Sequence, residues 1–400
     1  MNRSNGQGAR IGGGGAGTGT GGANLLALRS HNTALVLDLL RTAGAEGISR
    51  LELAERTGLT PQAVSKITAR LRDEGLAAEA GRRASTGGKP RTVLRLVPGA
   101  GHALGIHLDR DELRAVLVDL DGTVVAERCA PLDLGAGAET VLEGVARAVA
   151  ELAAEGLGHL VAEAARVPGA ALAAAPTLLG LGVALPGPLD HVRGVLHRIT
   201  GFPGWDGYPL REALERRLGV PVVVDKDTNA AALGLAVGGA GAGDGTFAYL
   251  HLGTGLGAGL VFGGGVHRGA RTGAGEFGHQ VVQLDGPPCT CGARGCIEAL
   301  CLAAVARGDL AEAARVLGTG AANLAGLLDI DLVLLGGRTV AAAPGAFVHG
   351  VGAVLDARAR REGGHDGPVP VRLAPGGTRG VAEGAAHLVL APLFGRGEGG

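Results

Sequence analysis

The sequence predicts an α/β protein with an N-terminal winged helix-turn-helix and a larger α/β body. Two helical patterns near the start are joined by a Gly-containing turn and followed by a basic segment. From about residue 103 onward, strand-like hairpin runs alternate with helical stretches. The 400 residues, of which 46% are hydrophobic, are enough for two or three domains.

Composition and charge exclude several classes of protein. Many of the 75 glycines lie in the first 22 residues, so we expect residues 1–26 to be a disordered tail. That start lacks the apolar core of a secretion signal, and no stretch reaches the ~18 uninterrupted apolar residues of a membrane span. We therefore expect a cytoplasmic protein without membrane contact. The net charge of −1 excludes a globally basic nucleic-acid binder but leaves room for a local basic patch.

Residues 27–98 are predicted to form the winged helix-turn-helix. Apolar residues at helical spacing predict a first helix over residues 32–41, and a second, short helix ends at Gly58. Thr60 and Pro61 are a cap and a first-turn residue for the next helix. Its expected buried stripe consists of Val64, Ile67 and Leu71.

The third helix is the candidate recognition helix of this module. Its expected exposed face carries Gln62, Ser65, Lys66 and Arg70, side-chain types that suit base edges and phosphates. Two extended runs then flank a loop that is predicted to be the wing, with Lys89 and Arg91 at its tip. Residues 60–95 hold eight Lys or Arg and three acidic residues, a net charge of +5 that suits DNA. The alternative is a small helical bundle with a solvated charged face.

The body shows strand and helix patterns in sequence. We expect paired strands over residues 103–126 with a turn at Asp121-Gly122, and a helix over residues 138–166. Further expected elements are a strand that breaks at residues 186–188, a strand over 221–225 that leads into a helix near Asn229, a Gly-rich hairpin around residues 253–259, and a buried strand over 330–337.

A segment from Gly275 to Glu298 gathers metal-ligand residue types. His279, Cys289, Cys291 and Cys296 form a His/Cys₃ set that is typical of a closed structural zinc site. The alternative is a group of free thiols; the odd count of five cysteines disfavours disulfides. Glu276 and Glu298 flank the ligands and are interpreted as pocket residues, the alternative being solvated loop acids.

Several motifs together resemble one family. LGTGLGAG, PGPLD followed by GWDGYPL, DTNAAALG, GEFGH with CTCGARGCIE, and LVLLGG occur in the order found in the ROK family (repressor, ORF, kinase). From about Ala27 to Phe394 the chain resembles the branch of transcriptional regulators with an N-terminal winged helix-turn-helix. The resemblance implies that residues 99–400 adopt the two-lobed actin-like, sugar-kinase (RNase H-like) ATPase fold.

The resemblance also implies a sugar site. The family's Asn-Asp pair, whose Asp is the kinase base, falls on Lys226-Asp227, and its other sugar-binding residues fall on Glu276, His279 and Glu298. His279 would bind both zinc and a sugar hydroxyl. The Lys that replaces the family's Asn has three interpretations: it favours an acidic or phosphorylated sugar, it blocks the pocket, or it pairs with Asp225 or Asp227.

The first phosphate loop departs from the family pattern Asp-x-Gly-Gly-Thr. The matching residues are His107, Leu108, Asp109, Arg110 and Asp111, and acids at this place would repel nucleotide phosphates. The segment 299–335 is also short, with room for about two helices. We therefore predict that kinase activity is lost and that Asp227 is vestigial.

The leading hypothesis is a sugar-responsive transcriptional regulator, a repressor of carbohydrate-metabolism genes. It would bind double-stranded operator DNA as a homodimer or homotetramer, with a sugar or sugar derivative as effector and structural Zn²⁺. One alternative is an active ATP-dependent sugar kinase with a regulatory DNA-binding module. Another is a DNA binder that ignores sugars and has a zinc-stabilised dimeric body.

Overall fold

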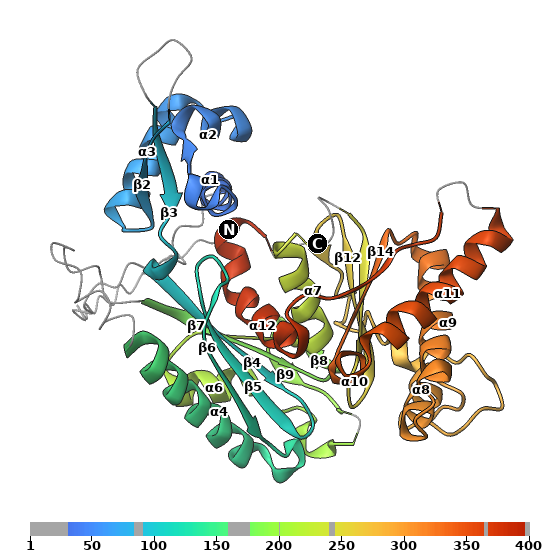
Figure 1. Cartoon of the computed structure of the whole chain (residues 1–400). Helices are drawn as coiled ribbons and strands as arrows, with labels where there is room; N and C mark the ends of the chain where they lie inside the picture. Colours follow the sequence, from blue (N-terminus) through green and yellow to red (C-terminus); the bar gives the residue numbers. More distant parts are fainter. Residues whose placement is uncertain are drawn as a thin grey trace, which may run out of the picture.

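The structure, a computed structural model, describes residues 31–83, 91–158, 177–199, 201–239, 245–363 and 367–396. The tail expected over residues 1–26 and the wing residue Lys89 lie outside these ranges. Figure 1 shows a small module standing on a body of two sheets, with two helices between the sheets. Within the described ranges, no helix combines the length and apolar character needed to cross a membrane.

The N-terminal module is a winged helix-turn-helix. Its three-stranded sheet has the order β1-β3-β2. The predicted turn is present, because Gly58 adopts the left-handed conformation and the Thr60 side chain accepts the N–H of Ala63. The sequence did not predict β1, which has only two residues. The elements are α1 (His31–Thr42), β1 (Ile48–Ser49), α2 (Arg50–Thr57), α3 (Pro61–Asp73), β2 (Ala77–Arg83) and β3 (Arg91–Leu96).

The buried stripe of α3 differs from the prediction in one position. Val64 and Leu71 are fully buried, but Ile67 is only partly buried and Thr68 is fully buried. The Thr68 hydroxyl donates to the Val64 carbonyl at 2.8 Å and accepts from Arg50 Nε at 3.2 Å. These two hydrogen bonds offset the cost of burying a polar group.

The first lobe is built on a five-stranded sheet of order β10-β7-β4-β5-β6. Residues 103–126 were expected as paired strands and span parts of three, with Asp121-Gly122 turning between β5 and β6. Helices α4 and α6 cover the outer face (Figure 1). The elements are β4 (Gly101–Leu108), β5 (Glu112–Asp119), β6 (Val124–Pro131), α4 (Ala138–Leu152), a π turn (Ala153–Leu157), β7 (Thr177–Leu185), β8 (Leu189–Asp190), β9 (Val195–Leu196), α6 (Leu210–Leu218) and β10 (Val222–Lys226).

The second lobe has a five-stranded sheet of order β13-β12-β11-β14-β15. The two helices expected over residues 299–335 are present as α8 and α9, and α11 packs against α9 on the outer side (Figure 1). The elements are β11 (Phe247–Leu252), β12 (Leu256–Phe262), β13 (Gly265–Val266), α8 (Ile297–Ala306), α9 (Leu310–Leu328), β14 (Leu332–Gly336), α10 (Arg338–Ala342), α11 (Pro344–Glu362) and β15 (Val371–Leu373).

Two helices fill the space between the sheets. Helix α7 (Asp227–Val237) begins two residues earlier than expected, directly after β10. Helix α12 (Gly380–Leu390) packs against α7 and against β4 and β7, and continues into the 3-10 turn η9 (Ala391–Phe394), which contacts α1 of the N-terminal module. One helix thus joins both lobes and the module.

Glycines permit unusually close packing of α12. A Cβ at Gly105 of β4 would overlap the Ala382 carbonyl, and one at Gly182 of β7 would overlap the Ala385 carbonyl. Within α12, a Cβ at Gly384 would overlap the Ala230 carbonyl of α7. Each clash is with backbone, so it cannot be relieved by rotating a side chain.

Gly384→Ala is therefore expected to destabilise the protein by about 1–3 kcal/mol, because overpacking outweighs the helix propensity of alanine. Gly352→Ala is the matched control, since Gly352 lies in α11 with no atom within 4 Å of an added Cβ. The control should be neutral or slightly stabilising. Urea unfolding monitored by circular dichroism measures both; equal stability of the two variants would contradict the close packing.

Candidate functional site

The His/Cys₃ cluster predicted from the sequence is assembled in the structure. His279 ends the short 3-10 turn η7 (Phe277–His279), and Cys296 caps α8. The four donor atoms lie within 4.8 Å of one another. Cys289 Sγ is 3.7 Å from His279 Nδ1, and Cys291 Sγ is 3.7 Å from Cys296 Sγ. A tetrahedral zinc with ordinary bond lengths places its donors about 3.5–3.8 Å apart, so the set fits such an ion.

Backbone glycines shape this loop. Gly292 and Gly295 both have positive φ angles, of 94° and 66°. A side chain at Gly295 would overlap the Gln283 carbonyl. The loop folds back on itself through the isolated bridges Val281 with Cys296 and Pro288 with Arg294, which brings the thiols together.

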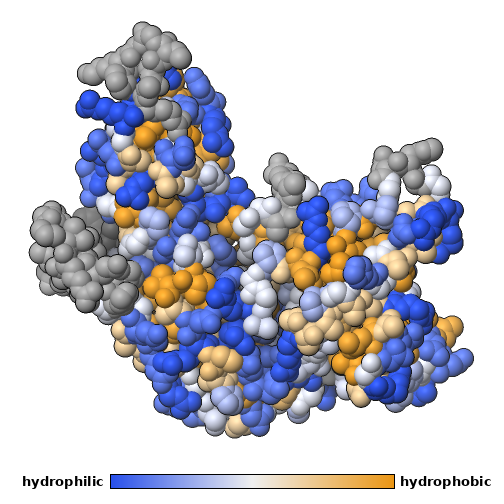
Figure 2. Space-filling view, viewed as in Figure 1, coloured by the Kyte–Doolittle hydropathy of each residue, from blue (hydrophilic) through white to orange (hydrophobic). Residues whose placement is uncertain are grey.

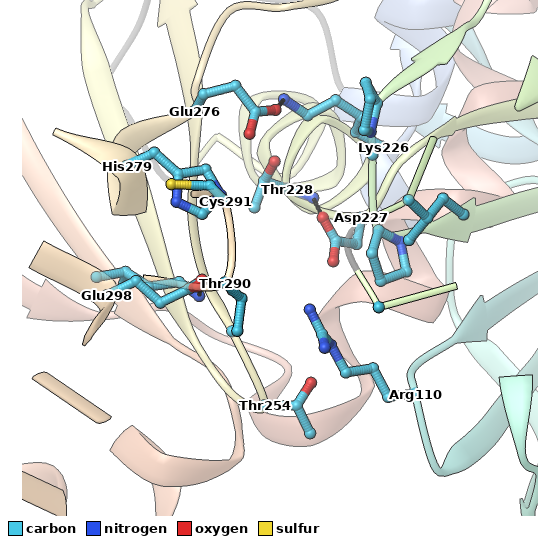
Figure 3. Close-up of a pocket in the computed structure, with 18 of the residues that line it drawn as sticks. Arg110, Lys226, Asp227, Thr228, Thr254, Glu276, His279, Thr290, Cys291 and Glu298 are labelled. Atoms are coloured by element: carbon cyan, nitrogen blue, oxygen red, sulfur yellow. Dashed lines mark hydrogen bonds and ion pairs between the residues drawn. The ribbon is translucent and has the colours of Figure 1, made fainter. Parts of the chain in front are cut away.

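A cavity of about 580 Å³ lies between the lobes next to the cluster. All five residues predicted for a sugar site line it: Lys226, Asp227, Glu276, His279 and Glu298. Figure 3 shows them around one space, with Arg110 and Thr254 on the opposite side from Glu276. Because His279 Nδ1 faces Cys289, its other ring nitrogen is the one left for a ligand. Glu298 accepts the Leu256 N–H at 2.9 Å, which fixes its carboxylate.

An ion pair of Lys226 with Asp225 or Asp227 was one of the three interpretations of this residue, and the structure does not contain it. Its ammonium donates to Glu276 Oε1 at 2.7 Å and to the Ala274 carbonyl at 2.8 Å. Asp225 is instead bound by Arg268 Nε at 2.7 Å. The Lys side chain is 4% exposed, whereas that of Glu276 is 46% exposed. The cation thus belongs to the cavity wall, and its charge is already compensated.

The acids of the first phosphate loop bind a cation across the cleft. Arg338, at the start of α10, donates to both carboxylate oxygens of Asp111, at 3.1 and 2.8 Å, and lies 3.6 Å from Asp109. The Thr254 hydroxyl donates to Asp109 at 2.7 Å. Burial opposes ionisation of Asp109, but His107, Thr254 and Arg338 outweigh it, so that its pKa lies below the ordinary value. The loop expected only to repel phosphate is a bridge between the lobes.

A row of aromatic side chains, of which His107 and Tyr249 are buried and His251 is partly buried, lies next to this loop. Burial, aided by His251, lowers the pKa of His107 although Asp227 and Asp109 oppose it, so the imidazole is neutral at pH 7. Its ring meets that of His251 edge-on at 6.1 Å, and His251 Nδ1 is 2.9 Å from the Tyr249 hydroxyl. A neutral imidazole here supplies no negative charge for a divalent cation.

The predicted recognition face is only partly free. Gln62, Ser65 and Lys66 are exposed on α3, and Arg91 is exposed at the start of β3. Arg70 Nη2 instead donates to Thr33 of α1 at 2.7 Å, and its Nε lies 3.9 Å from Glu74. In Figure 2 the module projects from the body, and many of its visible residues are hydrophilic.

Sequence reasoning placed Arg110 in the loop but did not include it, Arg198 or Thr254 among the site residues, although all three line the cavity. They come from segments far apart in the chain, and no local pattern marks them. Only the packing of the two lobes brings them to Asp227.

Comparison with known proteins places these features in a family. The model of the ROK family matches residues 103–304, about half of the chain, and a winged helix-turn-helix DNA-binding model matches residues 36–77. The xylose repressor of Bacillus subtilis (strain 168) is 29% identical over 251 residues, 63% of this chain and 61% of that protein. The DNA-binding transcriptional dual regulator NagC of Escherichia coli (strain K12) is 31% identical over 277 residues, 69% of this chain and 64% of NagC. The matched part spans less than two thirds of both relatives.

Solved structures share the architecture. A ROK family transcriptional regulator, described as a homologue of the E. coli MLC protein, superposes with a TM-score of 0.68 over 91% of this chain and 97% of its own. Its sequence identity is 21%, so this likeness concerns the fold alone. A ROK glucokinase from Streptomyces griseus, in complex with glucose and AMPPNP, gives a TM-score of 0.58 at 27% identity over 72% of this chain and 99% of its own.

The ion pair in the cavity wall predicts an asymmetric response to mutation. Glu276→Gln leaves the buried Lys226 charge uncompensated and should cost about 1–3 kcal/mol, a value reduced because Glu276 is half exposed. Lys226→Met leaves a carboxylate that water can solvate and should cost less than about 1 kcal/mol. Free energies of unfolding in urea test this order, and a larger loss for Lys226→Met would refute it.

Proposed function

The chain belongs to the ROK family, and we propose that it is a sugar-responsive, DNA-binding transcriptional repressor of carbohydrate-metabolism genes. Its kinase-like body binds the effector and does not phosphorylate it. The observation that carries the proposal is the fusion of an exposed, basic recognition helix to a body whose phosphate loop is tied across the cleft by Arg338 and Asp111. The repressor names of the two relatives agree with it.

Loss of kinase activity follows from charge. Phosphoryl transfer relies on backbone N–H groups, cations and Mg²⁺ around the moving phosphate. Here His107, buried and neutral, stands where the family pattern Asp-x-Gly-Gly-Thr has its Asp. Asp109 stands at its first Gly, and Asp111 stands at its Thr. Arg338 is paired with Asp111, so its guanidinium is not available to bind a phosphate.

The sugar would bind at Asp227, Glu298 and His279. Carboxylates accept hydrogen bonds from sugar hydroxyl groups in fixed directions, and the second ring nitrogen of His279, protonated when Nδ1 binds zinc, donates one. We assign the His/Cys₃ cluster to a structural Zn²⁺ that orients His279 from behind. Zinc supplies no reaction step in this proposal; it holds the loop and selects the ring nitrogen that faces the cavity.

DNA contacts are assigned to Gln62, Ser65 and Lys66 of α3, and to the wing residues Lys89 and Arg91. The guanidinium of Arg70, in contrast, is assigned to holding α3 on α1. A pseudo-palindromic operator would be bound by a homodimer or a homotetramer, with one α3 in each half-site. Effector binding would close the cleft and so change how well the two α3 helices of a dimer fit the two half-sites of the operator.

The proposal predicts a defined loss on removing Lys66. After selection of a binding site from random duplexes, Lys66→Ala should weaken binding and reduce the slope of log affinity against log salt by about 1. Arg361→Ala, an equal charge change on an exposed residue of α11, should leave both unchanged. Fluorescence anisotropy measures both. Failure of the wild type to bind any duplex, or sugar-dependent ATP turnover in a coupled assay, would overturn the proposal.

The zinc assignment predicts one metal ion per chain. Mass spectrometry of the purified full-length protein should find about one zinc, and Cys291→Ser should lower both the zinc content and the melting temperature. Cys129→Ser is the control, because Cys129 is exposed and lies outside the cluster. A metal-free wild type whose melting temperature is unaffected by chelators would refute the assignment.

A further inference from the structure

We infer that the effector is an anionic sugar, and that Arg110 binds its carboxylate or phosphate. This inference rests on the effector role proposed for the cavity and names the class of ligand. It depends on three features: how Arg110 is held, which charges in the cavity are already paired, and what faces Arg110 across it.

Arg110 is held in place from behind. Its carbonyl accepts the N–H of Leu134 at 3.0 Å, and the Leu134 carbonyl accepts from Trp205 Nε1 at 2.9 Å. The guanidinium carbon lies 5.6 Å from the centre of the Phe202 ring, a cation–π distance. Stacking on a ring uses one face of the planar group and leaves its N–H donors free in the plane.

Two of the other cations in or near the cavity already have acidic partners. Lys226 is paired with Glu276, and Arg338 is paired with Asp111. Among the described residues, by contrast, no carboxylate lies within 4.0 Å of the Arg110 guanidinium. Arg198 also lines the cavity and is exposed. A half-buried guanidinium with five donors and no acceptor is therefore available to a ligand.

Asp227 faces this guanidinium from the opposite side. In Figure 3 the two side chains point toward one another across the cavity without an ion pair between them. One Asp227 oxygen accepts the Thr228 N–H at 2.6 Å, so the carboxylate has a fixed direction. A ligand between the two needs hydroxyl donors toward Asp227 and an anion toward Arg110. A sugar acid and a sugar phosphate both meet this requirement.

A neutral sugar meets it poorly. Guanidinium forms its strongest hydrogen bonds with planar or multi-oxygen anions, through two parallel N–H donors. A single hydroxyl would offset little of the desolvation of the charge on cleft closure. Discrimination at Arg110 is therefore expected to favour the charged sugar over its neutral counterpart by about tenfold or more.

The test uses the full-length protein in thermal-shift assays and calorimetry at constant ionic strength. Glucose, xylose and N-acetylglucosamine are the neutral probes, glucuronate and galacturonate the carboxylates, and glucose 6-phosphate and N-acetylglucosamine 6-phosphate the phosphates. Inorganic phosphate and acetate control for binding of the anion alone. At least one charged sugar should raise the melting temperature, and the carboxylate and phosphate sets identify which anion it carries.

Arg110→Gln should weaken the charged sugar about tenfold or more and leave its neutral counterpart unchanged, with partial recovery in Arg110→Lys. Arg193→Gln is the matched control, since Arg193 is 80% exposed and lies outside the cavity lining. Equal binding of neutral and charged sugars, or no effect of Arg110→Gln, would refute the inference and leave the effector role standing. Binding of inorganic phosphate as tight as that of the sugar phosphate would also refute it. If no probe of any class binds, the proposed function itself fails.

Discussion

The backbone contact of α12 with β4, β7 and α7 is the constraint on which the rest of the structure depends. Gly105, Gly182 and Gly384 have no side chains, so the helix lies against the first sheet and against α7 with its carbonyl groups near the positions a Cβ would occupy. Its other residues are shared between two cores. Ala382 and Ala386 pack with the N-terminal module and the first lobe, whereas Val381 and Ala385 pack with α7 and the second lobe. Dense packing of this kind makes rigid-body shifts more favourable than local deformation.

This arrangement gives a physical route from the cavity to DNA. Helix α7 begins at Asp227, in the cavity wall, and runs along α12. After α12 the chain enters η9, where Phe394 lies 5.3 Å beneath the Arg41 guanidinium of α1. Asp38 of α1 accepts from both Arg41 and Arg396, each at 2.9 Å. Under the proposed function, a ligand that favours one lobe arrangement through Asp227 would act on α1 through these contacts, which is how the two sites would be coupled.

The two ends of the cleft differ in which residues pair with their charged side chains. At the end proposed to bind the sugar, Lys226 and Glu276 neutralise each other in the cavity wall, and His279 belongs to the His/Cys₃ cluster. On the nucleotide side, Asp111 and Asp109 bind Arg338 from the other lobe. Asp109 and Asp111, which were expected only to repel phosphate, thus form an ion-paired contact between the two lobes. Arg110 lines the cavity between the two ends and is the residue to which we assign the anion of the ligand.

The sequence by itself determined the module, the strand and helix order, the His/Cys₃ set and the residues around one cavity. These follow from short-range signals: the Thr60 cap, the left-handed Gly58, hydrophobic periodicity and family motifs with fixed spacing. Only the tertiary structure decided which charges pair. Lys226 lies 50 residues from Glu276, and Arg338 lies 227 residues from Asp111. An ion pair depends on distances of a few ångströms in space, which chain neighbours such as Asp225 and Asp227 do not specify. Helical periodicity made the exposed face of α3 predictable. The hydrogen bond that holds Arg70 on α1 was not predictable, because it too depends on a distance in space between residues far apart in the chain.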